Sequence, residues 1–342
     1  MSVNHTVLKQ SLALMMISGL FIYFLWMDIA LYHNVQHIAP VLPNSKRSHD
    51  KSSSLISPFT GLSVKMMMMD PINNYILTPI AQLFNYATSF SEKCYVITPN
   101  MISFTGLVFA GFAARCVVSD NIIRQRIAVL LFQGRTWCDA LDGIVARARM
   151  GMVKHASLRS TPGYVIDGLA DTLGFTAFLV GCYYYLRRWP PNESHYRVLS
   201  SKEHLEKNGG HAGENGSQTN WTARRLFYVV FCFGMQIAVS AFFWDRYIHS
   251  YSELLETPQS TVGTAMAQNE QLKSAFTWMI MWFWRVCNAH CLIQFLLIAI
   301  VMGNMWEFFR FVQYSGFAVL LVLAFFSELN LHIMMSSLMQ TS

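Results

Sequence analysis

Length, composition and charge together exclude an ordinary soluble protein. The chain has 342 residues, of which 53% are hydrophobic and only 13% are charged, whereas soluble domains carry about 25% charged residues. The formal net charge of +6 is spread over the ends of apolar blocks, without the basic stripe that nucleic acid requires. The sequence therefore predicts an integral membrane protein that binds no nucleic acid.

Seven apolar blocks match the ~20 residues that cross the hydrocarbon core of a bilayer as a helix. The first block is too long for the core of a signal peptide and is followed by no A-x-A cleavage site, so we expect a retained anchor. The sequence thus predicts an all-α fold with seven transmembrane helices. They cover residues 11–33, 100–118, 125–147, 163–187, 225–247, 276–302 and 307–330.

The remaining segments suggest how the chain is divided. Residues 34–96 mix apolar and polar residues, which favours amphipathic helices lying along the membrane interface; Met66–Met69 are interpreted as lipid-facing. Residues 188–224 contain proline, glycine and many polar residues, which is typical of a loop. We expect an anchor over residues 1–33, an interfacial segment over 34–96, a six-helix core over 97–330 and a tail over 331–342.

Four aspartates carry most of the chemical information. Asp139 and Asp142 share one helix face with Gly143 and Ala146, because these positions are spaced by 3, 4 and 7 residues. Arg147 is followed by a spacer of fifteen residues, and then come Gly163, Asp167 and Asp171 at spacings of four. Two helix faces, each with two carboxylates, are therefore expected to meet at a membrane boundary.

Such acids are costly in an apolar chain, at about 2.5–3.5 kcal/mol for an aspartate at the centre of a membrane helix. Divalent cations would relieve this cost, and oxygen ligands favour Mg²⁺ or Mn²⁺. Two ions could clamp the attacking and leaving oxygens of a phosphoryl displacement. Gly143 and Ala146 would allow a base and its phosphates close to the backbone, and Arg147 could bind a phosphate.

These residues resemble the signature of the CDP-alcohol phosphotransferase family, which reads D-x2-D-G-x2-A-R, a spacer, and G-x3-D-x3-D. Every fixed position is present, although the spacer has fifteen residues instead of eight or nine. Thr98-Pro99-Asn100 resembles the opening of the family's first core helix. The resemblance covers residues 97–330 and implies a six-helix catalytic core, with dimers common in the family; a homodimer is therefore a possible assembly.

The resemblance also implies roles for individual residues. Asp139, Asp142, Asp167 and Asp171 match metal ligands, and Asp171 also matches the general base. The residues expected around the CDP group are Asn100, Gly143, Ala146, Arg147 and Gly163. The expected cofactor is Mn²⁺ or Mg²⁺, as two ions.

Beyond the signature, the sixth predicted span contains Arg285, Asn288 and His290, which are candidates for an acceptor or headgroup site. For each of them a structural hydrogen bond is the main alternative. His290 is also a candidate for assisting proton transfer.

The layout is most similar to a Golgi-resident, manganese-dependent insect branch of the family, which uses CDP-ethanolamine as donor and ceramide as acceptor. Ethanolamine or choline transfer to diacylglycerol, or another CDP-alcohol phosphatidyltransferase activity, is the alternative within the family. An ion-coupled transporter that uses the aspartates as an ion path is the alternative from another class, but no internal repeat supports it.

The two sides of the membrane give conflicting indications. Seven spans place the chain termini on opposite sides, with the aspartates on the side of the C-terminus. N-glycosylation sequons begin at Asn4, Asn192, Asn215 and Asn220, all on the side of the N-terminus. Glycans there would make the site cytosolic, whereas the resemblance implies a luminal site, which is the orientation we expect.

Overall fold

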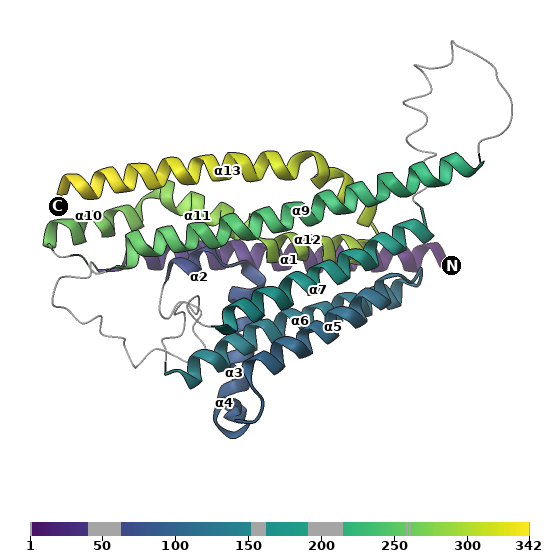
Figure 1. The fold of residues 1–342 in the computed structure, drawn as a ribbon, viewed down its shortest axis with the longest axis horizontal. Helices are drawn as coiled ribbons and strands as arrows, with labels where there is room; N and C mark the ends of the chain where they lie inside the picture. The colour runs from purple at the N-terminus through teal and green to yellow at the C-terminus, as the bar shows by residue number, and fades with distance from the viewer. Residues whose placement is uncertain are drawn as a thin grey trace, which may run out of the picture.

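The structure, a computed structural model, describes residues 2–39, 63–151, 162–190, 215–257, 259 and 261–341, and every regular element in these ranges is helical. The predicted all-α fold is thus confirmed for this part of the chain. Six long helices run along the longest axis of the molecule (Figure 1). They are α1 (Ser2–Gln36), α5 (Pro99–Val117), α6 (Ile122–Arg149), α7 (Pro162–Arg188), α9 (Asn215–Glu256) and α13 (Met305–Thr341).

Shorter helices complete the bundle and its ends. They are α2 (Val64–Met68), the π-helical turn η1 (Asn73–Leu77), α3 (Thr78–Thr88), α4 (Phe90–Lys93), α10 (Val262–Lys273), α11 (Ala275–Cys287) and α12 (Ala289–Met302). The N-terminus lies at one end of the bundle and the C-terminus at the other (Figure 1). The end that bears the C-terminus is called the site end below.

The predicted number of seven spans is not confirmed. In the described residues, five helices are long and apolar enough to cross a membrane, or six if the bent pair α11–α12 counts as one span. The helix α6, which covers the third predicted span, is not among them. It packs against α5 and α3 and contacts α7 through side chains, such as Phe132 against Phe175. Its many arginines and aspartates make it too polar to be counted as a span.

The predicted span 276–302 is two helices. Asn288 adopts an extended backbone, and its side-chain oxygen accepts a hydrogen bond of 2.8 Å from the Cys291 amide at the start of α12. This is an N-cap, which begins a new helix, and α11 and α12 meet at 49°. Three other elements are longer than predicted: α1 begins at Ser2, α9 extends to Glu256, and α13 continues through residues 331–341. The predicted loop 188–224 is wrong for its last residues, because α9 begins at Asn215.

The helices pack closely inside and expose apolar side chains outside. A side chain at Gly181 of α7 would lie 2.6 Å from the Ala114 carbonyl of α5, so these two helices approach closely only because glycine stands there. On α13, Phe311, Leu321 and Phe325 are 65–72% exposed. Such large apolar side chains on an outer face fit contact with lipid.

The segment after α1 enters the protein core in part. Met66, Met67 and Met68 of α2 are at most 2% exposed, so the interpretation of the methionine run as lipid-facing is wrong. In contrast, α3 lies across the bundle axis (Figure 1) and exposes Ile80 and Leu83. An interfacial position for α3 stays a prediction.

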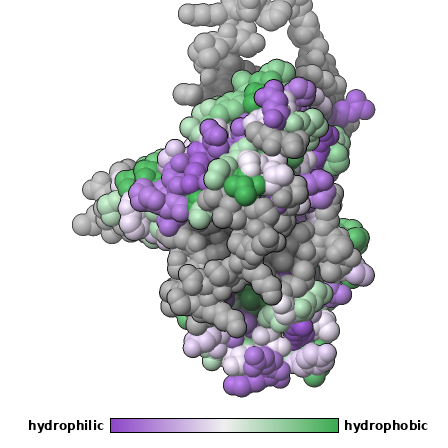
Figure 2. All heavy atoms as spheres, turned by 90° about the vertical axis from the view of Figure 1, so that its left-hand side faces the viewer, coloured by the Kyte–Doolittle hydropathy of each residue, from purple (hydrophilic) through white to green (hydrophobic). Residues whose placement is uncertain are grey.

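The site end of the bundle is rich in polar residues. Seen from this end, the described residues include many hydrophilic side chains (Figure 2).

Candidate active site

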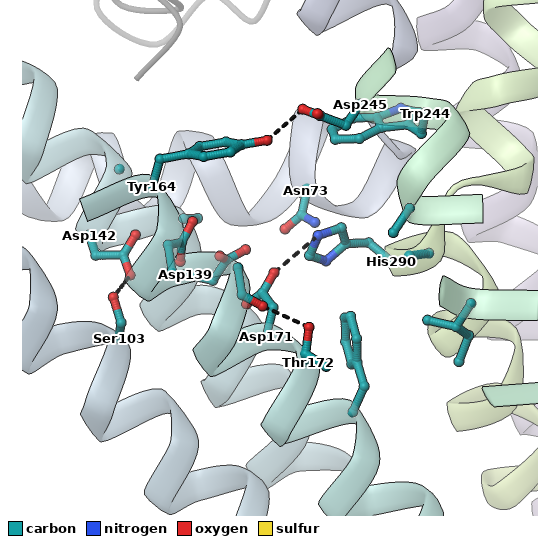
Figure 3. Close-up of a pocket in the computed structure, with 18 of the residues that line it drawn as sticks. Asn73, Ser103, Asp139, Asp142, Tyr164, Asp171, Thr172, Trp244, Asp245 and His290 are labelled. Carbon is teal, nitrogen blue, oxygen red and sulfur yellow. Dashed lines mark hydrogen bonds and ion pairs between the residues drawn. The ribbon is translucent and has the colours of Figure 1, made fainter. Parts of the chain in front are cut away.

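The four aspartates converge at one place, as their spacing predicts. Asp139 and Asp142 lie on α6, and Asp167 and Asp171 lie on α7. All four line one cavity, and Figure 3 shows Asp139, Asp142 and Asp171 around a common space. The residues 152–161, which join the two helices, lie outside the described residues, so the long spacer itself is not described.

The aspartates form two overlapping groups that could each hold a metal ion. One carboxylate oxygen from each of Asp139, Asp142 and Asp167 lies within 4.8 Å of the others. The same holds for Asp139, Asp171 and a ring nitrogen of His290. Asp139 belongs to both groups. Two hard-ligand groups that share a carboxylate fit a pair of divalent cations.

Two of these carboxylates have further partners that fix them. The Ser103 hydroxyl of α5 donates a hydrogen bond to Asp142, which is only 4% exposed (Figure 3). The Arg135 guanidinium forms an ion pair with Asp171 and is itself 3% exposed. His290 Nε2 lies 3.7 Å from the other oxygen of Asp171. Asp171 is therefore held between two basic groups at the wall of the cavity.

Two aromatic rings pack against the Arg135 guanidinium. Its guanidinium lies 4.6 Å from the centroid of Phe175 and 5.7 Å from that of Phe132. A cation over an aromatic face is stabilised by the charge distribution of the ring. Because Arg135 is buried and paired, Asp171 has a fixed direction toward the cavity.

The residues expected around the CDP group lie at the same cavity. Its lining includes Asn100, Gly143, Ala146, Arg147 and Gly163. A side chain at Gly143 would lie 3.2 Å from both terminal nitrogens of Arg147, so the guanidinium lies directly over this glycine. The cavity therefore presents a cation and small residues beside the aspartates.

The cavity continues from this polar end into an apolar groove between α7 and α9, with a total volume of about 1190 Å³. Its apolar walls are Leu179, Val180, Tyr183 and Tyr184 of α7 and Phe227, Val230, Phe231 and Met235 of α9. Asp171 and Tyr184 are thirteen residues apart on one helix. At ~1.5 Å per residue, the groove extends roughly 20 Å along α7.

Of the three candidates in the sixth predicted span, only His290 lies at the cavity. His290 reaches the cavity, but Arg285 and Asn288 are not among the residues that line it. Arg285 is fully buried, forms an ion pair of 3.2 Å with Asp28 of α1 and lies 4.8 Å from the ring centroid of Tyr75. Asn288 is the cap of α12. The structure gives both a role in packing.

The sequence did not single out four functional candidates: Ser103, Arg135, Lys65 and the hydrogen bond between Tyr164 and Asp245, two residues that line the cavity (Figure 3). A signal existed for Arg135, because it lies four residues before Asp139 and seven before Asp142, on the same helix face. Lys65 had no such signal, since it belongs to a short helix whose position depends on contacts far away in the sequence.

Comparison with known proteins agrees with this geometry. The model of the family described as ceramide phosphoethanolamine synthase matches residues 4–338. The ceramide phosphoethanolamine synthase of Drosophila melanogaster is 34% identical over 287 residues, which cover 84% of this chain and 72% of the relative. No solved structure matches the chain. The match over nearly the whole length shows that the chain belongs to the ceramide phosphoethanolamine synthase family.

Proposed function

We propose that this chain transfers phosphoethanolamine from CDP-ethanolamine to the primary hydroxyl of ceramide, with ceramide phosphoethanolamine and CMP as products. The observation that carries the proposal is the single cavity that joins four aspartates to an apolar groove. A nucleotide donor needs the polar end, with its carboxylates and Arg147. A lipid acceptor needs the apolar end.

The groove suits an acyl or sphingoid chain. Its roughly 20 Å along α7 is close to the length of an extended chain of sixteen carbons. It begins beside Asp171 and passes between the apolar side chains of α7 and α9. A lipid with its tail there would have its hydroxyl at the aspartates.

The metal ligands in this proposal are Asp139, Asp142, Asp167, Asp171 and His290. When bound, two Mn²⁺ or Mg²⁺ ions would supply positive charge that stabilises the negative charge of the diphosphate while the bond between its two phosphates breaks. The protein's own contribution is to hold these ligands on two rigid helices and to exclude water from the apolar end of the cavity.

Asp171 is the proposed general base. One of its carboxylate oxygens takes the proton of the ceramide hydroxyl while the hydroxyl oxygen forms a bond to the phosphorus that bears ethanolamine. The bond from that phosphorus to the oxygen bridging it to CMP breaks, and CMP leaves with the bonding electrons. Arg135 keeps Asp171 ionised and oriented toward the acceptor. Arg147, Gly143, Ala146, Gly163 and Asn100 bind the CDP group.

The proposed location is a Golgi membrane with the site end facing the lumen. Asn4 lies at the start of α1, and Asn215 and Asn220 at the start of α9, at the end of the bundle opposite the site (Figure 1). The Asn192 sequon lies outside the described residues. A luminal site predicts that none of these sequons is glycosylated. A glycosidase-sensitive band that disappears in Asn215→Gln/Asn220→Gln would reverse the orientation.

A headgroup-transfer assay on purified protein tests the activity. Labelled CDP-ethanolamine is offered with Mn²⁺ and either ceramide or diacylglycerol, and the lipid product and CMP are measured. We expect transfer to ceramide. Asp139→Asn should reduce it by about 10³-fold, because this residue belongs to both metal groups, whereas Asp120→Asn on the exposed α5–α6 connection should not. Transfer to diacylglycerol alone would contradict the acceptor, and no CMP release from any CDP-alcohol would contradict the reaction.

A further inference from the structure

Lys65 is a half-buried cation in the lining of the active-site cavity. It lies on α2 and lines the same cavity as the four aspartates and Arg147. No hydrogen bond or ion pair joins its ammonium to any residue that the structure describes. Burial lowers the pKa of this ammonium and Arg147 lowers it further, while Asp139, Asp167 and Asp245 act in the opposite direction from a distance. Lys65 is only partly exposed, and an ammonium that is partly removed from water without a close counter-charge is costly, which points to an anionic ligand.

The protein fixes the short helix that carries Lys65. Side chains from α9 and α11, from Asn288 between α11 and α12, and from the Ser63 cap hold the backbone of α2 through hydrogen bonds. The contacts are Val64 N–H to Glu256 Oε1 (2.7 Å), Met66 N–H to Ser63 Oγ (3.2 Å), Trp244 Nε1 to the Met68 carbonyl (2.8 Å), Arg285 Nη1 to the Met66 and Met67 carbonyls (both 3.4 Å), and Asn288 Nδ2 to the Met68 carbonyl (3.4 Å). With Met66 and Met68 fully buried, α2 presents Lys65 to the cavity from a rigid support.

The charges of the proposed complex leave a place for this cation. A pair of divalent ions would balance the carboxylates of Asp139, Asp142, Asp167 and Asp171. The diphosphate of a CDP-alcohol brings one negative charge on each phosphate. Lys65 and Arg147 are the lysine and the arginine in the part of the cavity lining that the structure describes, one for each phosphate of the donor. The lining also contains three further acids, and each accepts a hydrogen bond within the protein: Asp70 from Asn73, Asp245 from Tyr164 and Glu256 from the Val64 amide.

We propose that Lys65 binds the diphosphate of the CDP-alcohol donor, together with Arg147, and stabilises the negative charge that grows on the departing CMP. This inference rests on the proposed function for its donor. It assigns to the segment before the catalytic core a part of the donor site. A rival explanation is that Lys65 only offsets the charge of the aspartates within the folded protein.

Two kinds of measurement on the full-length protein with Mn²⁺ separate these explanations. The first is binding of CDP and of cytidine to wild type, Lys65→Met and Lys65→Arg, with thermal unfolding of each variant. The second is the steady-state kinetics of CMP release with CDP-ethanolamine. Lys93→Met is the matched control, because Lys93 is exposed on α4 and lies outside the cavity lining.

We expect Lys65→Met to weaken CDP binding by at least about 10-fold and to lower kcat/KM for CDP-ethanolamine by roughly 10²-fold. Cytidine, which has no phosphate, should bind as before, the KM for ceramide should not change, and Lys65→Arg should recover part of the loss. Unchanged CDP affinity in Lys65→Met, or equal losses for CDP and cytidine, would overturn the assignment. If Lys65→Met does not fold, full CDP affinity in Lys65→Gln would overturn it.

The binding arm also separates this inference from the proposed function. Wild-type protein that releases no CMP from CDP-ethanolamine would refute the reaction, whereas the difference between CDP and cytidine would still decide whether Lys65 binds the diphosphate.

Discussion

Two buried arginine–aspartate pairs in this protein have different surroundings. Arg135 pairs with Asp171 at the wall of the cavity, and Arg285 pairs with Asp28 in the interior near α1. Both arginines are at most 3% exposed, and both lie over an aromatic ring. Burial and pairing alone therefore do not distinguish a catalytic group from a structural one.

The difference lies in how many partners each aspartate has inside the protein. The Asp28 carboxylate accepts hydrogen bonds from the Tyr75 hydroxyl (2.7 Å) and from Trp282 Nε1 (2.9 Å), in addition to its pair with Arg285. Asp171 has Arg135, a distant His290 at 3.7 Å and an open cavity. A carboxylate with spare capacity that faces a cavity can bind a ligand, whereas a saturated one holds helices together.

The strongest test replaces each arginine by methionine. Arg135→Met should lower kcat by about 10²–10³-fold per folded molecule, because Asp171 loses the charge that keeps it ionised and oriented. Arg285→Met should lower kcat per folded molecule much less, because Arg285 reaches the site only through the α2 backbone that carries Lys65. It should lower the free energy of unfolding by roughly 3–5 kcal/mol, since Asp28 becomes an unpaired buried charge. Kinetics and thermal unfolding of both variants check this. Equal effects on kcat would break the distinction.

A double substitution sharpens the structural half of the comparison. Asp28→Leu with Arg285→Met removes both charges, and replacing a buried pair by apolar residues is often nearly neutral. We expect the double variant to be more stable than Arg285→Met alone by about 2 kcal/mol or more, as measured by thermal unfolding in detergent. A double variant no more stable than the single one would show that the remaining contacts of Asp28, and not its charge, dominate.

A third prediction concerns the weaker partner of Asp171. His290→Gln removes an imidazole from one of the two metal groups but keeps a polar side chain. We expect the Mn²⁺ concentration for half-maximal activity to rise by about 10-fold, with little change in stability. His249→Gln on α9, outside the cavity lining, is the control. An unchanged metal requirement would exclude His290 as a ligand.

The smallest predicted effect lies at the apolar end of the cavity. Met235→Trp adds volume to the groove between α7 and α9. The KM for long-chain ceramide should rise several-fold, because each methylene group displaced from an apolar pocket costs about 1–3 kcal/mol of binding energy. The KM for a short-chain ceramide should rise less. Equal changes for both acceptors would argue against the groove as the site of the lipid chain.

The sequence predicted the convergence of the four aspartates better than it predicted the residues that support them. Regular spacing on two helices was enough to bring Asp139, Asp142, Asp167 and Asp171 together, because helix geometry fixes which residues share a face. The break at Asn288 was missed, although an asparagine at a helix start is a known cap signal, because the apolar composition is continuous across it.

Long-range contacts explain the other failures. The burial of Met66–Met68 depends on carbonyl contacts with Arg285 and Asn288, more than two hundred residues away. No local pattern encodes such contacts. For the same reason, a run of methionines was indistinguishable from a lipid-facing segment. The polar face of α6 also made composition an uncertain guide to the number of spans.

The ion pair of Asp28 limits how freely the first helix can be exchanged. Membrane anchors are often regarded as interchangeable, because any sufficiently apolar stretch of about 20 residues can insert. Here the anchor supplies a carboxylate to Arg285, and Arg285 in turn holds the backbone of α2. If a generic apolar helix replaced α1, the buried Arg285 guanidinium would lose its Asp28 counter-charge. The first helix and the rest of the bundle therefore form one structural unit, although the sequence suggests an anchor attached to a separate core.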